Sequence, residues 1–214
     1  MSEPEAGGGR SLHAYLAAVA AGTPTPGGGS VAGVVGALAA ALGEMVANLT
    51  LGRERYAEAE AALRPARHRL THLRETLMAA AAEDERAYAA YREAAALPRA
   101  TAEQKAARAT AMREALLAAT EVPLGVASAA VETAEILEVV ARAGNPHVRS
   151  DAALGALLAE AALRGALLNV YGNAATLGDA GLAERFRTEA ERLETRGRDA
   201  AERAFRTAAD AAER

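Results

Sequence analysis

Two aspartates of this sequence carry carboxyl groups that could transfer a proton. Asp84 follows the run MAAAAE, and Asp151 follows the loop GNPHVRS. A carboxylate that accepts and returns a proton beside a reacting atom acts as a general acid and base, which is typically worth about 100-fold to 10,000-fold in rate. From the residues alone, Asp84 can also be an exposed helix carboxylate among charged neighbours, and Asp151 can be a helix cap.

A glycine turn offers a way to hold a polar ligand. Gly27, Gly28 and Gly29 follow a pair of prolines, and they can adopt backbone angles that other residues resist. Ser30 comes next and is predicted to be the N-cap of a helix, because its hydroxyl can accept from an amide of the first turn. Free N–H groups at such a turn favour a carboxylate, a phosphate or a ring carbonyl. We therefore expect ligand contacts at this turn.

Two pairs of polar residues, one of asparagines and one of histidines, each have the four-residue spacing that places both members on one helix face. Asn169 and Asn173 are four residues apart in an apolar stretch, so their amides either bond across a helix interface or face a ligand. His68 and His72 are also four apart and Glu75 follows, a spacing that can hold zinc on one helix face. Arginines flank these histidines and the chain has no cysteine, so we predict a solvated surface and no metal site.

The glycine turn leads into a helix predicted from Ser30 to Leu51. Nearly every side of it is apolar, which predicts a central buried helix. Its apolar part, Val31 to Val46, is shorter than the roughly 20 residues that span a bilayer and includes Glu44, so we predict no membrane span. Small residues recur at spacings of three and four and form a stripe that another helix can approach closely. These residues are Gly33, Gly36, Ala40, Gly43 and Ala47.

Composition indicates one all-α domain. The chain has 214 residues, of which 51% are hydrophobic and only 3% aromatic, and it lacks the clustered β-branched residues of strands. Small side chains bury limited area in one subunit, which favours an oligomer. The net charge of -4, with both signs mixed, argues against a nucleic-acid partner. The lack of cysteine and an N-terminus without an apolar signal core are consistent with a cytoplasmic location.

The composition of the N-terminus separates a predicted tail from the helical domain. Residues 1–10 are predicted to be a disordered tail, and residues 11–214 a single helical domain in which Ser11 caps a short first helix.

Prolines and a cap mark the middle of the chain. Pro65 predicts a kink or a late helix start, and Pro123 predicts an interruption of a helix. Thr101 and Gln104 form a predicted capping box, and Gly144 is predicted to end a helix.

Helix geometry separates the polar residues into two ends. Ser30 and Asn48 are eighteen residues apart, and so are Asp151 and Asn169, which places each pair on one helix face. At about 1.5 Å of rise per residue, the members of a pair lie roughly 27 Å apart. One compact site cannot use both ends of one helix. Either the ligand is long or a partner subunit supplies one end, and the small-residue stripe favours the partner.

Five stretches of the chain together resemble the cyclodeaminase and cyclohydrolase family. They are TPTPGGGSVAG, MVANLTLG, VASAA after EVP, GNPHVRSDAALGALL and ALLNVYGN, and they extend over nearly the whole chain. Members of the family include the cyclodeaminase domain of formiminotransferase-cyclodeaminase and bacterial methenyltetrahydrofolate cyclohydrolases. The resemblance implies an elongated helical bundle that forms a homodimer or a higher even oligomer. It also implies a tetrahydrofolate derivative as substrate and no permanently bound cofactor.

The resemblance implies a reaction as well. In formiminotetrahydrofolate the nitrogen at position 10 attacks the amidine carbon on position 5, and ammonia leaves to give 5,10-methenyltetrahydrofolate. We therefore expect a cyclodeaminase, which would act in histidine degradation. One alternative is a cyclohydrolase, which adds water to the methenyl compound to give 10-formyltetrahydrofolate. A third is a helical folate-binding or interaction protein without catalysis.

Matched residue by residue, the family pattern assigns the site. It makes Asp84 and Asp151 the catalytic residues, with Asp84 preferred as the acid and base. Arg53 and Arg55 would attract the glutamate carboxylates of folate. The other implied substrate contacts are Gly27, Gly28, Gly29, Ser30, Asn48, Asn145, Ser150, Asn169 and Asn173.

Overall fold

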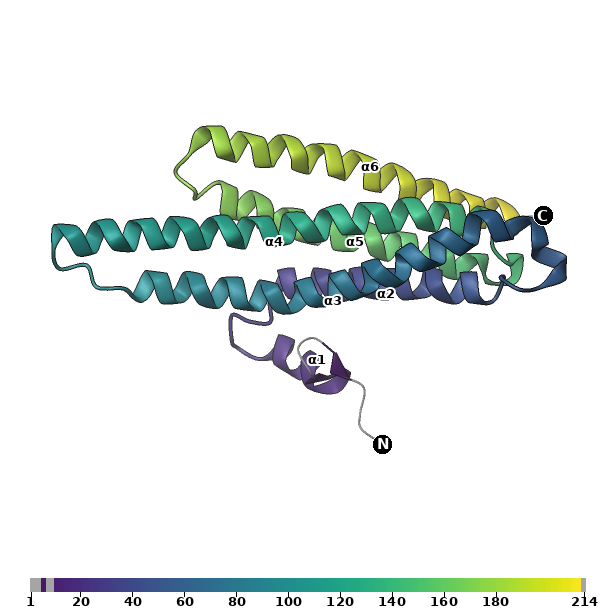
Figure 1. Cartoon of the computed structure of the whole chain (residues 1–214), viewed down its shortest axis with the longest axis horizontal. Helices are drawn as coiled ribbons and strands as arrows, with labels where there is room; N and C mark the ends of the chain where they lie inside the picture. The colour runs from purple at the N-terminus through teal and green to yellow at the C-terminus, as the bar shows by residue number, and fades with distance from the viewer. Residues whose placement is uncertain (1–4, 7–9, 213–214) are drawn as a thin grey trace.

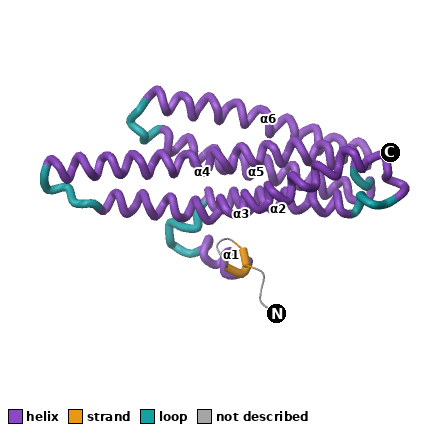
Figure 2. Tube along the Cα trace, in the orientation of Figure 1, coloured by secondary structure: helices purple, strands orange, loops and turns teal. Residues whose placement is uncertain are grey.

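The computed structural model describes residues 5–6 and 10–212, and it confirms the all-α class (Figure 1). Apart from one short strand pair, the described elements are helices (Figure 2). In chain order they are β1 Glu5–Ala6, β2 Arg10–Ser11, α1 Leu12–Ala20, α2 Gly28–Asn48, η1 Glu54–Ala59, α3 Glu60–Ala96, α4 Ala102–Ala143, η2 Pro146–Val148, α5 Arg149–Ala174 and α6 Ala180–Ala212.

The predicted disordered tail lies partly outside the described residues. Within it, Glu5–Ala6 pairs antiparallel with Arg10–Ser11, so these residues of the tail are ordered beside the start of α1. Ser11 caps α1 as predicted, and its hydroxyl accepts from the N–H of Ala14 at 3.2 Å.

The bundle is elongated, with α2 to α6 running along one axis and α1 lying beside them (Figure 1). Helix α4 packs against α2, α3, α5 and α6, whereas α2 packs against α3, α4 and α5. Within the described chain the central helix is therefore α4, and the prediction that α2 is central is wrong. The α3–α4 hairpin extends beyond the other helices at one end (Figure 1).

The small-residue stripe of α2 is in close contact with its neighbours, as predicted. A Cβ at Gly33 would lie 2.8 Å from the main-chain oxygen of Leu77 in α3. A Cβ at Gly43 would lie 2.7 Å from side-chain atoms of Leu70 and of Leu137. Glycine in a helix interior costs roughly 1 kcal/mol relative to alanine, and the close approach of α3 and α4 offsets this cost.

Two large apolar residues of α2 face outward, so the helix is not buried on every side as expected. Leu38 is 54% exposed and Met45 is 37% exposed, because the glycine side of the helix is the one that enters the bundle. The neighbouring α5 exposes Leu154, Leu157 and Leu168. These five residues define an apolar surface that we call the α2–α5 face.

The same two helices meet the length and composition criteria for crossing a membrane. Among the described residues these segments are Gly28–Asn48 and Pro146–Ala174, of which only the first had been considered from the sequence. The most apolar windows of the two are 56% and 50% buried inside the bundle, a degree of burial that core helices also have.

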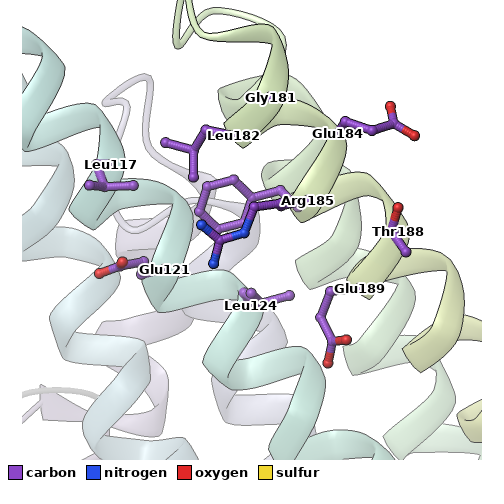
Figure 3. A pocket seen from close by; sticks show the side chains of 10 residues that line it. Leu117, Glu121, Leu124, Gly181, Leu182, Glu184, Arg185, Thr188 and Glu189 are labelled. Atoms are coloured by element: carbon purple, nitrogen blue, oxygen red, sulfur yellow. The ribbon is translucent and has the colours of Figure 1, made fainter.

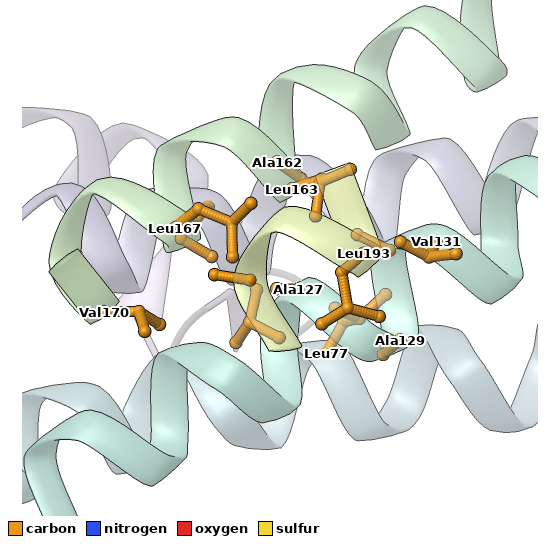
Figure 4. Packing of buried hydrophobic residues seen from close by; sticks show 14 of the residues in the cluster. Leu77, Ala127, Ala129, Val131, Ala162, Leu163, Leu167, Val170 and Leu193 are labelled. Atoms are coloured by element: carbon orange, nitrogen blue, oxygen red, sulfur yellow. The ribbon is translucent and has the colours of Figure 1, made fainter. Parts of the chain in front are cut away.

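Alanine and leucine share the core. In Figure 4, Leu77 of α3, Val131 of α4, Leu163 and Leu167 of α5 and Leu193 of α6 meet in one cluster. Buried alanines between them allow the helix axes to approach, so the leucines interdigitate with few voids. This packed core holds the ends of α2, α3 and α5 in a fixed relation.

Both prolines lie inside helices, so the predicted interruption at Pro123 is wrong. Helix α3 begins at Glu60, five residues before Pro65, and α4 runs through Pro123 without a break. A proline leaves the carbonyl four residues earlier without its helix partner. For Pro123 that carbonyl belongs to Ala119, and the side-chain amide of Asn173 donates to it at 2.7 Å.

Other boundary predictions had mixed outcomes. The capping box of Thr101 and Gln104 is present, and Gly144 ends α4. Helix α2 begins two residues earlier than predicted, with Gly27 as its N-cap, so Ser30 lies inside the first turn. Asp151 likewise lies in the first turn of α5, where the N-cap is Val148.

Replacing Gly33 with alanine tests the close approach. We expect Gly33→Ala to lower the free energy of unfolding by about 1–3 kcal/mol, because the new methyl meets main-chain atoms of α3. Gly125→Ala in α4 is the matched control, since a Cβ there meets nothing within 4 Å. It should stabilise the chain by about 0.5–1 kcal/mol, as measured by urea unfolding. A Gly33→Ala protein as stable as the wild type would contradict the close approach.

Candidate functional site

A cavity of about 380 Å³ lies where the N-terminus of α2 meets α3, α4 and the C-terminal part of α5. It brings together residues from four separate parts of the chain. Its walls are formed by Pro24, Thr25, Gly27, Gly28, Gly29, Asp84, Ala87, Tyr88, Tyr91, Leu116, Ala119, Asn169, Gly172, Asn173 and Thr176. Six of the predicted site residues, including Asp84, are therefore neighbours in space.

Asp84 is the only carboxylate among the residues that line this cavity. Burial raises the pKa of Asp84 above its ordinary value, and the negative charge of Glu85 raises the pKa further, while a hydrogen bond from the backbone N–H of Ser30 lowers it in part. A Cβ at Gly29 would lie 2.0 Å from Oδ1 of Asp84, so glycine is required for the carboxylate to rest against the main chain. A half-buried carboxylate with a raised pKa in a cavity is a candidate for a proton-transfer group.

Both asparagines line the cavity while their amide nitrogens are bound to backbone. Nδ2 of Asn169 donates to the carbonyl of Gly165 at 3.0 Å, and Nδ2 of Asn173 donates to the carbonyl of Ala119 at 2.7 Å. The second of these bonds crosses from α5 to α4, which confirms the helix-interface interpretation for Asn173, while its contact with a ligand stays a prediction. The fixed nitrogens orient the amides, which leaves each Oδ1 as an acceptor for a ligand N–H.

Two tyrosines line the cavity and were not assigned from the sequence. Tyr88 and Tyr91 follow Asp84 by four and seven residues, which places all three on one face of α3. This helical spacing was the signal that could have identified them. Their rings give the cavity an apolar wall against which a flat heterocycle can pack.

The remaining predicted contacts lie at the opposite end of the bundle. They are Asn48, Arg53, Arg55, Asn145, Ser150 and Asp151. There the Tyr56 hydroxyl donates to Oδ1 of Asn145 at 2.7 Å, and the guanidinium of Arg55 lies 4.7 Å from the centre of the Tyr56 ring. Asp151 begins the helix whose Asn169 lines the cavity, so about 27 Å separates the two residues along α5. Within one subunit, Asp84 and Asp151 therefore lie at opposite ends of the bundle and cannot act in the same cavity.

Ser30 lies behind the cavity. It is fully buried and does not line the cavity wall, and its hydroxyl is hydrogen-bonded to Tyr15 at 2.9 Å. The Ser30 side chain therefore does not contact a ligand in the cavity directly, and Ser30 can affect the ligand only through its backbone and the residues beside it.

The histidine pair of α3 gains no further ligand in the structure. Across residues 5–6 and 10–212, three or more histidine, aspartate or glutamate side chains do not gather at any place where they could hold a metal ion. His68 and His72 are thus a pair on the surface of α3.

A second and larger hollow, of about 920 Å³, lies between α4 and α6 (Figure 3). Leu117, Leu124 and Leu182 form much of its floor, and Glu121 and Glu184 are exposed at its rim. Glu121 and Glu184 are exposed and Glu189 is paired with Arg192, so the smaller cavity with Asp84 is the better candidate for proton transfer.

The helical fold places a half-buried aspartate beside two oriented amides in a small polar cavity, an arrangement that suits acid–base chemistry. The sequence profile of formiminotransferase-cyclodeaminase matches residues 11–192. The chain is 44% identical to a methenyltetrahydrofolate cyclohydrolase of Methylorubrum extorquens, over 87% of this chain and 89% of that protein. It is 35% identical to the formimidoyltransferase-cyclodeaminase of Gallus gallus, over 87% of this chain but only 34% of that longer protein.

The solved structures include a similar fold. The formiminotetrahydrofolate cyclodeaminase of Thermotoga maritima superposes with a TM-score of 0.84 at 28% identity, over 94% of this chain and 96% of that one. The chain belongs to the formiminotransferase-cyclodeaminase family, and it is an enzyme like these relatives. The resemblance first seen in the sequence motifs is confirmed.

Replacing Asp84 with asparagine tests its environment. The folded-state pKa of Asp84 is raised, so the stability that the protonated form provides is present in acid and is lost as pH rises through the raised pKa. We therefore expect Asp84→Asn to have a higher Tm than the wild type at pH 7, and the difference to vanish below about pH 4. Asp151→Asn is the control, since Asp151 lies in the first turn of α5 where a negative charge is favourable. A lower Tm of Asp84→Asn at pH 7 would contradict this account.

Proposed function

We propose that the Asp84 cavity acts on the one-carbon group carried between nitrogens 5 and 10 of tetrahydrofolate, with Asp84 as the acid and base. The observation that carries this proposal is the raised pKa of Asp84 in a cavity whose acceptors are oriented. A volume of about 380 Å³ accommodates a bicyclic pterin rather than a whole folate. The Oδ1 atoms of Asn169 and Asn173 suit the N–H donors of the pterin edge.

Hydrolysis of 5,10-methenyltetrahydrofolate is the reaction we favour. Support comes from the 44% identity to a methenyltetrahydrofolate cyclohydrolase that matches this chain over most of its own length. This ranking reverses the order expected from the sequence motifs, which placed cyclodeaminase first.

The chemistry requires a group that moves protons between two atoms. Asp84, when ionised, takes a proton from the water that attacks the methenyl carbon, and a carbinolamine forms. Asp84 then gives a proton to nitrogen 5 as the bond from the carbon to that nitrogen breaks, and the hydroxyl proton of the carbinolamine is released. The products are 10-formyltetrahydrofolate and one proton.

Cyclodeamination of formiminotetrahydrofolate is the second candidate, supported by the similarity to the Thermotoga maritima enzyme over 96% of its chain. Here nitrogen 10 attacks the carbon of the formimino group, which is protonated as an amidinium, and Asp84 accepts the proton that nitrogen 10 loses. Asp84 then protonates the formimino nitrogen, which leaves as ammonia, and 5,10-methenyltetrahydrofolate remains. Both reactions need one carboxylate at one carbon, which is why one site can serve either.

Purified protein distinguishes the two reactions and the inactive alternative. We expect loss of the methenyl absorbance when 5,10-methenyltetrahydrofolate is supplied, faster than the uncatalysed hydrolysis. Formation of that absorbance from 5-formiminotetrahydrofolate would instead favour the cyclodeaminase. Asp84→Asn should lower kcat at least about 100-fold, and Gly29→Ala should lower it as well because its methyl displaces the carboxylate. Wild-type protein that acts on neither compound would overturn the proposal.

We further propose that two copies of the chain associate through the α2–α5 face. In a protein that works in the cytoplasm, as we propose for this one, five exposed large apolar residues on two helices that pack together suggest a contact surface. Association would also explain why predicted site residues lie at both ends of one subunit, because the end that holds Arg53 and Asp151 could approach the partner's cavity. Arg53 and Arg55 would then bind the glutamate carboxylates of the folate tail.

Charge placed on the α2–α5 face tests the association. We expect Leu38→Glu with Leu154→Glu to convert a dimer to a monomer in light scattering, because both side chains are exposed in one subunit and would be buried in the dimer. Phe205→Glu is the control, since Phe205 is 51% exposed on α6, outside this face. Wild-type protein that is monomeric at micromolar concentration would refute the association.

A further inference from the structure

A chain of hydrogen bonds outside the cavity connects α1 to the back of the Asp84 site. The hydroxyl of Tyr15, a residue that is 2% exposed, lies 2.9 Å from Oγ of the fully buried Ser30. Oγ of Ser30 donates to Oε1 of Glu85 at 3.4 Å, and Arg10 pairs with the other oxygen of Glu85 at 3.1 Å. These four residues come from β2, α1, α2 and α3.

The donor and acceptor of each hydrogen bond in this network follow from the chemistry of its groups. A carboxylate only accepts, so the single hydroxyl proton of Ser30 is directed to Glu85. Ser30 therefore accepts from Tyr15, and burial raises the pKa of Tyr15, which keeps its proton in place as a donor. Each hydroxyl in this network therefore donates in a single direction, so the network fixes the position of residue 30 in addition to filling space.

Ser30 takes part both in this hydrogen-bond network and in the surroundings of the cavity. Its backbone N–H hydrogen-bonds to the Asp84 carboxylate, while its side chain belongs to the network. The main chain cannot shift toward Asp84, because the carboxylate already rests against Gly29. A displacement at residue 30 therefore changes the hydrogen bond that Asp84 receives.

Anchoring alone does not require the Tyr15 hydroxyl. Tyr15 is the buried residue of α1, whereas Leu12 and Leu16 are more than half exposed, so the ring of Tyr15 provides the attachment of this helix. A phenylalanine ring would bury nearly the same area, and a buried hydroxyl is unfavourable unless it is bonded. The hydroxyl is thus explained by the direction it gives to Ser30.

We propose that Tyr15 is a positioning residue for proton transfer, which acts through Ser30 to hold the backbone N–H of residue 30 on the carboxylate of Asp84. This inference rests on the proposed role of Asp84 as the acid and base. Tyr15 does not line the cavity, so its effect falls on the reacting carboxylate and not on substrate binding.

The Tyr15→Phe variant tests the proposal by kinetics. We expect kcat to fall about ten-fold while KM stays within about twofold, because the reacting carboxylate is displaced and the cavity walls are intact. Thr133→Val is the matched control, since it removes a buried hydroxyl that bonds only to the Ala129 carbonyl of its own helix. This control should keep the wild-type kcat. A wild-type kcat in Tyr15→Phe, or a loss expressed in KM, would overturn the proposal.

A double variant tests the route through Ser30. If Tyr15 acts through Ser30, Tyr15→Phe combined with Ser30→Ala should be no less active than Ser30→Ala alone. Losses that multiply would show that the two hydroxyls act independently and would overturn the proposed route.

Carbon-13 titration of the aspartate carboxyl groups, in protein without substrate, tests the same inference without an activity measurement. The Asp84 signal is assigned by its absence in Asp84→Asn. The groups that act on Asp84 are the Ser30 N–H and the Glu85 carboxylate, which itself is paired with Arg10. Loosening the Ser30 N–H removes a bond to the ionised form, so the pKa of Asp84 should rise in Tyr15→Phe and not in Thr133→Val. An unchanged pKa would refute positioning, even if the protein has no folate activity.

Discussion

The close approach of α2 to α3 is the contact on which the site depends. Gly29, Gly33 and Gly36 lack the Cβ atoms that would meet Asp84, the Leu77 main chain and the Leu77 side chain. Because the two helices touch through main chain, the carboxylate rests on the first turn of α2 and becomes half-buried. A larger residue at position 29 would separate the Asp84 carboxylate from the backbone N–H of Ser30. The stripe therefore contributes both to packing and to the electrostatics of the cavity.

The cavity combines groups with opposing effects on charge. Burial and Glu85 disfavour the ionised form of Asp84, while the Ser30 N–H favours it. Burial has the larger effect, so the pKa of Asp84 lies above its ordinary value. Elsewhere in the described chain the ion pairs are mostly exposed ones, such as Arg69 with Glu132, which contribute little to stability. Asp84 is thus an unusual carboxylate in this chain, since it is half-buried without a cationic partner among the interactions that shift its pKa.

Local signals predicted local structure well. The Ser11 cap, the Thr101–Gln104 box and the end of α4 at Gly144 follow from side chains that bond within their own turn. The prolines misled, because Asn173, fifty residues after Pro123, satisfies the carbonyl that this proline leaves free. The glycine turn, Asp84 and the asparagines were found from the sequence. Tyr15 was not, because its role arises from contacts between α1, α2 and α3 that no local pattern encodes. Tyr88 and Tyr91 were also missed, although their spacing from Asp84 on α3 is a local signal.

The way α1 is attached has a consequence for limited proteolysis. Its link to α2 begins with the exposed residues 21–24, and the helix is held to the bundle chiefly by the buried ring and hydroxyl of Tyr15. A protease that cuts this link would leave α2 to α6 and their core intact while the peptide with Tyr15 could dissociate. The digested protein would still melt cooperatively, yet Ser30 would have lost its donor. If Tyr15 acts as proposed, a single peptide-bond cleavage just before the wall residues Pro24 and Thr25 would separate folding from full turnover.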